Sequence, residues 1–86
     1  MSAYKLRPGV RWVVERFGIV LTDGSGVART LPYPQAAIWD LFSRGYAFEK
    51  TVSMMCHIAE IDEAGADGLV RAAVAEWLAG GLLEQV

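Results

Sequence analysis

The chain has 86 residues and a mass of 9.4 kDa, the size of one small domain. Hydrophobic residues make up 53% and charged residues 21%, so the composition excludes a disordered chain. The net charge of -2 gives no general attraction to nucleic acid, and no apolar stretch reaches membrane-spanning length. We therefore expect one folded domain over residues 1–86, without a nucleic-acid or membrane partner.

The charge distribution and the cysteine content indicate the compartment in which this domain works. Residues 1–50 hold seven basic against four acidic residues (+3), and residues 51–86 hold one basic against six acidic residues (-5). The single cysteine, Cys56, excludes an internal disulfide and fits a reducing compartment. The N-terminal residues lack the apolar run of a signal peptide, so we expect a cytoplasmic protein.

Three short strands are predicted in the first third of the chain. The first covers Val10 to Phe17, where apolar and polar residues alternate except at Val13. The second covers Ile19 to Thr22, and the glycine-rich turn Asp23 to Gly26 leads into the third, Val27 to Leu31. In a simple meander the third strand is an outer one, so one side of its backbone lacks a partner.

After Pro32 and Pro34 the apolar residues repeat at helical spacing to the end of the chain. This spacing predicts helices from Pro34 to about Gly45, from about Phe48 to Ala59, and from about Ala66 to Ala79. We interpret Asp62 to Gly65 as a loop, and we expect Leu82 and Leu83 to pack back onto the core. The predicted fold class is α+β, with a three-stranded antiparallel sheet followed by three helices.

The residues that carry catalysis are sparse in this chain. His57 is the only histidine, and adjacent helical positions point about 100° apart. Cys56 and His57 therefore do not converge on a metal, and Cys56 lies on the predicted buried stripe of its helix. Gly24-Ser25-Gly26 is too short for a phosphate loop and enters a strand. We predict a protein that is not an enzyme and holds no metal or cofactor.

Two apolar features of the predicted helices can be interpreted either as internal packing or as contacts with a partner. Met54, Ile58 and Ile61 form a second stripe on the middle helix, which is either covered by a neighbouring loop or is a contact surface for a partner or a second copy. Trp39 lies off the main apolar stripe of its helix. It either packs against the sheet or anchors a partner.

The order of these signals resembles PqqD-like proteins, the peptide-recognition elements of ribosomal peptide (RiPP) biosynthesis. The resemblance is carried by Leu6 to Val10, by the segment Ala37 to Gly45, and by Val74 to Leu83 at the end of the chain. Pro32 stands where the family has a polar cap, and Ala47 stands where it has Ser or Thr before the second helix. These departures leave the branch open among pyrroloquinoline quinone formation, lasso peptides and other radical-SAM pathways.

The resemblance implies a winged helix-turn-helix layout and a non-catalytic peptide chaperone. Such domains bind the leader of a precursor peptide as an added antiparallel strand, in a groove between the third strand and the third helix. They deliver it to a modifying enzyme, here expected to be a radical SAM enzyme. The candidate peptide-binding residues on the strand are Val27, Ala28, Arg29, Thr30 and Leu31. Those on the helix are Asp67, Leu69, Val70, Arg71, Ala73 and Val74.

Two other functions remain alternatives. A winged-helix layout also serves DNA-binding proteins, but the third helix carries only Arg71 against Asp67 and Glu76. A small dimerisation or adaptor subunit is the other alternative, with Met54, Ile58 and Ile61 as its contact residues.

Overall fold

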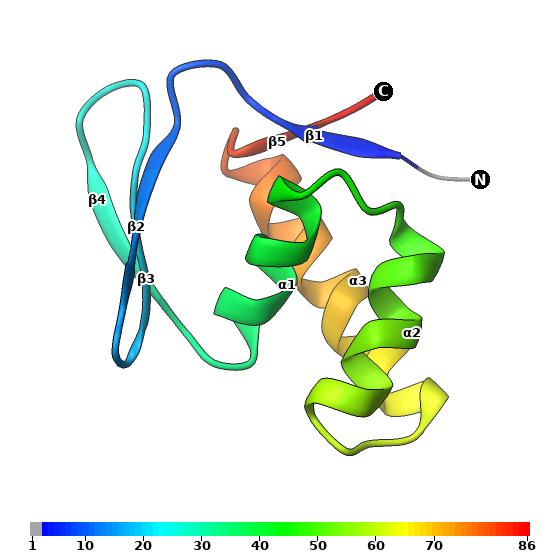
Figure 1. The fold of residues 1–86 in the computed structure, drawn as a ribbon. Coiled ribbons are helices and arrows are strands. Elements are labelled where there is room, and N and C mark those ends of the chain that lie inside the picture. Colours follow the sequence, from blue (N-terminus) through cyan, green and yellow to red (C-terminus); the bar gives the residue numbers. More distant parts are fainter. Residues whose placement is uncertain (1–2) are drawn as a thin grey trace.

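The structure is a computed structural model that describes residues 3–86. Within these residues the chain forms two antiparallel sheets and three helices, shown in Figure 1. In chain order the elements are β1 (Tyr4–Leu6), β2 (Arg11–Glu15), β3 (Gly18–Thr22), β4 (Ala28–Pro32), α1 (Gln35–Ser43), α2 (Phe48–Ile58), α3 (Glu63–Ala79) and β5 (Leu83–Gln85). The predicted α+β class, with a three-stranded antiparallel sheet followed by three helices, is confirmed.

Strands β2, β3 and β4 form the predicted meander, with β3 in the middle. The first strand is shorter than predicted and ends at Glu15, because Arg16 and Phe17 make the tight turn into β3. The third strand runs one residue further than predicted, to Pro32. Proline is tolerated there because it lies at the end of an edge strand. Both β2 and β4 are therefore edges of this sheet within residues 3–86.

A second, two-stranded sheet was not predicted. It pairs β1 near the N-terminus with β5 near the C-terminus, and it lies at one end of the helices (Figure 1). Lys5 and Glu84 face each other in this pairing and form a salt bridge of 3.3 Å. Leu82 and Leu83 pack into the core as expected, with 1% and 2% of their surface exposed.

The helices depart from the prediction at two places. Asp62 to Gly65 is not a loop: α3 begins at Glu63, because the Asp62 side chain accepts a hydrogen bond of 2.8 Å from the backbone N–H of Gly65. This is an N-cap, which satisfies a donor that the first helical turn leaves without a partner. On α2 the buried positions include Thr51, and Cys56 is only half-buried. The Thr51 hydroxyl is accommodated because it donates to the carbonyl of Ala47 at 2.9 Å.

Trp39 joins the sheet to the helical layer. Its side chain is completely buried, and its ring meets Trp12 of β2 and Trp77 of α3 edge to face, with centroid distances of 5.9 and 5.2 Å. Edge-to-face packing is a favoured arrangement for aromatic pairs. The first of the two predicted fates of Trp39, packing against the sheet, is therefore confirmed.

The turn between β3 and β4 is held by one carboxylate. Asp23 accepts hydrogen bonds from the hydroxyl and the backbone N–H of Ser25 and from the backbone N–H of Val27. The Ser25 hydroxyl and the neighbouring N–H groups lower the pKa of Asp23, because they favour its charged form. These bonds fix the hairpin that carries β4.

Glycine is required at position 18, and its replacement is the first testable prediction. Gly18 has a φ of 153°, and a Cβ built there would lie 2.0 Å from the carbonyl oxygen of Leu31. We expect Gly18→Ala to lower the free energy of unfolding by about 2–4 kcal/mol, because the backbone of β3 or β4 must move.

The matched control is Gly24→Ala in the next turn, where nothing lies within 4 Å of the added Cβ. It should change the free energy of unfolding by less than about 1 kcal/mol. Urea denaturation followed by circular dichroism measures both values. Equal stability of the two variants would contradict the close approach of β3 and β4.

Candidate functional site

The first component of the site is the outer edge of β4. The backbone N–H of Asp23 donates to the carbonyl of Val27, which shows that odd-numbered residues of β3 point their backbone groups toward β4. Antiparallel ladders alternate, so Arg29 and Leu31 pair with β3 while Ala28, Thr30 and Pro32 turn their groups outward. This edge offers the N–H groups of Ala28 and Thr30 and the carbonyls of all three residues.

The second component is the C-terminal half of α3, which lies beside the start of β4. The guanidinium of Arg29 forms a salt bridge with the carboxylate of Glu76. A Cβ added to Gly80 would lie 3.6 Å from Nη1 of the same arginine, so the helix end and the strand are in contact. Both side chains of the ion pair are partly exposed, so the pair adds little to stability. The pair nevertheless links β4 to α3, the two elements that form the walls of the site.

The third component is an apolar hollow of about 510 Å³ at the opposite end of β4. It is lined by Tyr33, Pro34, Ala37, Ile58, Ala59, Ile61 and Leu69. These residues come from the segment after β4, from α1, from the end of α2 and from the N-terminal half of α3. No charged side chain lines the hollow, so it suits an apolar group rather than an ion.

The ion pair and the hollow show that β4 and α3 run alongside one another in opposite directions. Arg29 meets Glu76, and four residues further along the strand Tyr33 shares the hollow with Leu69. Four strand residues span about 13 Å, and the seven residues from Glu76 back to Leu69 span about 10 Å of helix. The two lengths are similar, so β4 approaches α3 near Arg29 at one end and near Tyr33 at the other.

The predicted site residues divide into those on this surface and those elsewhere. On the strand, Val27, Ala28 and Thr30 are exposed, Arg29 pairs with Glu76, and Leu31 is buried with 3% exposure. On the helix, Leu69 lines the hollow. Val70, Ala73 and Val74 are core residues with 5% exposure or less, so their side chains do not line a surface.

Asp67 and Arg71 do not meet Arg29. They pair with each other at 2.6 Å, and the Arg71 guanidinium lies 5.0 Å from the ring centroid of Phe48 on α2. The ion pair that joins the strand to the helix is instead formed by Arg29 and Glu76. Glu76 is not among the predicted site residues, because only the position of α3 relative to β4 distinguishes it from Asp67.

The second stripe of α2 is divided in the structure. Ile58 is 53% exposed and lines the hollow together with half-buried Ile61, whereas Met54 is half-buried against the core and lies outside the hollow. The hollow also includes Tyr33, which is 56% exposed. Tyr33 follows the strand without belonging to a periodic segment, so no periodic pattern predicts it as a site residue.

His57 and Cys56, the residues considered for metal binding, do not line the hollow. His57 is exposed, and Cys56 is half-buried on α2. Among residues 3–86 there is no group of three or more His, Cys, Asp or Glu side chains that could hold a metal ion. No helix in this part of the chain is both long and apolar enough to cross a membrane.

Comparison with known proteins identifies the fold. No protein-family model matches the chain, and no curated protein matches its sequence. Two solved structures are similar to it. One is a lasso peptide synthetase B1 complexed with the leader peptide, with a TM-score of 0.83 and 23% identity, covering 94% of this chain and 96% of that one. The other is TbiB1 in complex with the TbiA(beta) leader peptide, with a TM-score of 0.86 and 22% identity, covering 93% of this chain and 94% of that one.

Strand β4 places Leu31 in the core and Arg29 at the surface, and this difference gives the second prediction. Leu31→Ala should lower the free energy of unfolding by about 2–5 kcal/mol, because it leaves a cavity in the core. Arg29→Ala should lower it by less than about 1 kcal/mol, because its ion pair is partly exposed. Both residues face β3 through their backbones, so the comparison isolates the side chains. Chemical denaturation of the two variants measures the difference, and a larger loss for Arg29→Ala would contradict this arrangement.

Proposed function

We propose that this chain binds the leader segment of a ribosomally made precursor peptide and presents it to a modifying enzyme. The leader adds to β4 as an antiparallel strand and lies between β4 and α3. The observation that carries this proposal is the outward row of backbone groups on β4, which is linked to α3 through Arg29 and ends at an apolar hollow. The two similar structures, each holding a leader peptide, support it.

Backbone pairing alone gives modest affinity. The outer edge of β4 offers two N–H groups and three carbonyls, and each hydrogen bond contributes about 0.5–1.5 kcal/mol. Ordering a flexible peptide costs about 2–5 kcal/mol, which offsets most of that gain. Micromolar binding requires about -8 kcal/mol. Side chains must therefore supply the larger part of the affinity.

The hollow is the place where a peptide side chain adds that affinity. Strand β4 runs toward the hollow, so an antiparallel peptide begins at the hollow and continues along β4. The residue that enters the hollow therefore lies on the N-terminal side of the segment paired with Ala28 to Pro32. Burying a large apolar side chain contributes about 1.5–3 kcal/mol. We infer that the leader carries an aromatic or branched apolar residue there.

The identity of the modifying enzyme is a separate question. A radical SAM enzyme stays a prediction that follows from the resemblance to PqqD-like proteins. The similar structures favour an enzyme of lasso peptide synthesis instead, because one of them is a lasso peptide synthetase B1. We propose that this chain serves a pathway of the lasso type, with the modifying enzyme contacting a surface other than β4.

Duplex DNA binding is less well supported by the charges of α3. This helix carries Glu63, Asp67 and Glu76 against a single basic residue, Arg71, whose guanidinium is paired with Asp67. A recognition helix needs free cationic and amide side chains for phosphates and base edges. Retained binding to random duplex in a salt-dependent gel shift would favour DNA over peptide.

The strand-addition mode gives the third prediction, which uses Thr30→Pro. This change removes an outward N–H and leaves the hydrogen bonds between β3 and β4 intact, so the fold should persist. Titration of the labelled protein with synthetic lasso leader peptides, followed by amide shifts, measures binding. We expect at least a tenfold loss of affinity, about 1.4 kcal/mol or more.

Thr30→Val is the matched control, because it keeps the backbone N–H and the β-branched shape. It should bind as the unchanged protein does. In the unchanged protein the amide shifts should concentrate on β4 and α3. Binding by Thr30→Pro at full strength would show that the peptide does not pair with β4.

The hollow gives the fourth prediction, tested by Leu69→Asp. A carboxylate there opposes burial of an apolar side chain, so affinity for the leader peptide should fall about tenfold or more. Leu78→Asp is the control, because Leu78 lies on the opposite face of α3 by helical angle and is 38% exposed. Isothermal titration calorimetry distinguishes the two. Equal losses would point to a general effect on α3 and remove the hollow from the site.

A further inference from the structure

The sheet has a second free edge, strand β2, on the side opposite β4. All five of its residues are exposed, and its centre is apolar, with Trp12, Val13 and Val14 exposed to 36%, 60% and 64%. Its pairing with β3 is continuous and contains no bulge. Edge strands are usually protected by a bulge, a proline or charged side chains. Arg11–Glu15 has no bulge and no proline, and its charges lie at its two ends, so its apolar centre is open to a partner.

The direction of the backbone groups on β2 follows from the ladder. Residues Ile19 and Leu21 of β3 point toward β4, so Gly18, Val20 and Thr22 point toward β2. Their register partners Arg11, Val13 and Glu15 therefore pair with β3. This leaves the N–H and carbonyl groups of Trp12 and Val14 on the free edge.

The sequence of β2, Arg-Trp-Val-Val-Glu, is complementary to itself in the antiparallel direction. If a second copy pairs symmetrically about Val13, Trp12 of one copy lies opposite Val14 of the other. These are the residues whose backbone groups point outward, so both pairs can form hydrogen-bonded pairs. A register shifted by one residue would instead place an outward group opposite an inward one.

The same register pairs the charges. Arg11 of each copy lies opposite Glu15 of the other, and the two Val13 side chains meet at the centre. These are non-hydrogen-bonded positions, where side chains of facing residues approach most closely. Within residues 3–86, neither Arg11 nor Glu15 has a salt-bridge partner. Both charges are therefore available to a second copy.

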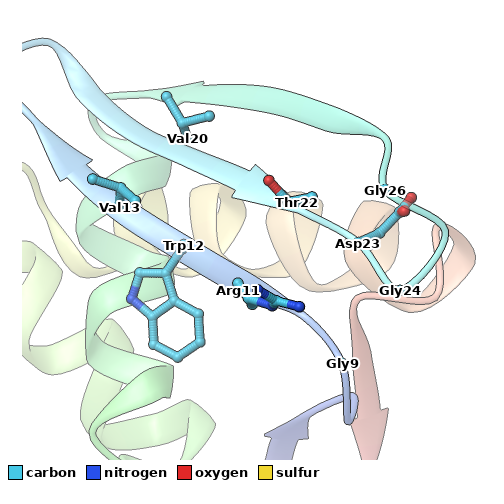
Figure 2. A pocket seen from close by; sticks show the side chains of 9 residues that line it. All are labelled: Gly9, Arg11, Trp12, Val13, Val20, Thr22, Asp23, Gly24 and Gly26. Carbon is cyan, nitrogen blue, oxygen red and sulfur yellow. The ribbon is translucent and has the colours of Figure 1, made fainter.

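The outer face of the sheet leaves room for these contacts. Figure 2 shows the side chains of Arg11 and Val13 from β2 beside those of Thr22 and Val20 from β3. They line a shallow hollow of about 410 Å³ that extends to the turn at Asp23. No helix covers this face in Figure 1, because the helices lie on the other side of the sheet. The Arg11 and Val13 side chains are thus accessible from solvent.

We propose that two copies of this chain associate through β2, edge to edge and antiparallel about Val13, to form a continuous six-stranded sheet. The two β4 edges then lie at the outer ends of this sheet and stay free. A symmetric contact of this kind closes on itself, so it gives a dimer rather than a filament. The inference does not rest on the proposed peptide function.

The test uses charge reversals on the full chain, with mass measured by light scattering and sedimentation from about 1 µM to about 1 mM. The unchanged chain should form dimers within this range. Arg11→Glu places two like-charged pairs in the dimer, and so does Glu15→Arg. Each variant should weaken dimerisation about tenfold or more. Arg16→Glu makes the same change in charge in the turn, outside the pairing, and should leave dimerisation unchanged.

Two combinations test the register itself. The double variant Arg11→Glu with Glu15→Arg restores both pairs and should dimerise as the unchanged chain does. An equimolar mixture of the two single variants should form heterodimers, because every facing pair is then of opposite charge. Circular dichroism of each variant establishes that it is folded.

A backbone variant provides an independent measurement. Val14→Pro removes an outward N–H and should abolish dimerisation, whereas Val14→Thr keeps the N–H and should dimerise. The proposal is overturned if the unchanged chain stays monomeric across the whole range, or if the mixed single variants do not associate. It is also overturned if Ile58→Asp, and not Val14→Pro, dissolves the dimer, because the interface is then the α2 stripe. Leader-peptide titration is a separate measurement, so failure of either proposal leaves the other intact.

Discussion

The indole of Trp39 is the contact on which the arrangement of this protein depends. It is fully buried between Trp12 of the sheet and Trp77 of α3, so one side chain joins three elements that are distant in the sequence. Its Nε1 is buried without a hydrogen-bond partner among residues 3–86. Such a donor costs about 1–3 kcal/mol. The aromatic packing around it outweighs that cost, since a tryptophan buries about 150–250 Å².

The position of β4 against α3 follows from this contact. With the sheet held on the helices by Trp39, Arg29 reaches Glu76 at one end of the strand, and Tyr33 shares a hollow with Leu69 at the other. The packing of the core therefore sets the positions of β4 and α3, which form the walls of the candidate site. The surface itself is nearly free of net charge, because its one ion pair neutralises itself. This suits an extended peptide better than a phosphate backbone.

The two edges of the sheet differ in what they can accept. The outer backbone groups of β4 lie beside a helix and a hollow, which favours a single strand with a particular side chain. The outer groups of β2 lie in the open, flanked by an arginine and a glutamate in symmetric positions. This favours a copy of the same strand. A three-stranded meander leaves both edges free by its topology, and the side chains around each edge decide the partner.

The types of the elements can be predicted from the order of residues, because hydrophobic period and turn chemistry are local properties. Alternation before Pro32, helical spacing after Pro34 and the glycines around residue 25 predicted the meander and the helices, and these are confirmed. Local signals also had limits. The composition around Asp62 predicts a loop, although this residue caps α3. The β1–β5 sheet has no local signal, because its strands are three residues each and lie at opposite ends of the chain.

Which side chains share a surface depends on how the elements pack against one another in three dimensions. By charge and spacing alone, Asp67 and Glu76 are equally plausible ion-pair partners for Arg29, and the position of α3 relative to β4 selects Glu76. In the same way Val70 and Val74 lie on the stripe that packing buries, and Tyr33 enters the site although it belongs to no periodic segment. Periodicity fixes the direction of a side chain relative to its own element. The contact between two elements depends on how they pack, which is a property of the whole core.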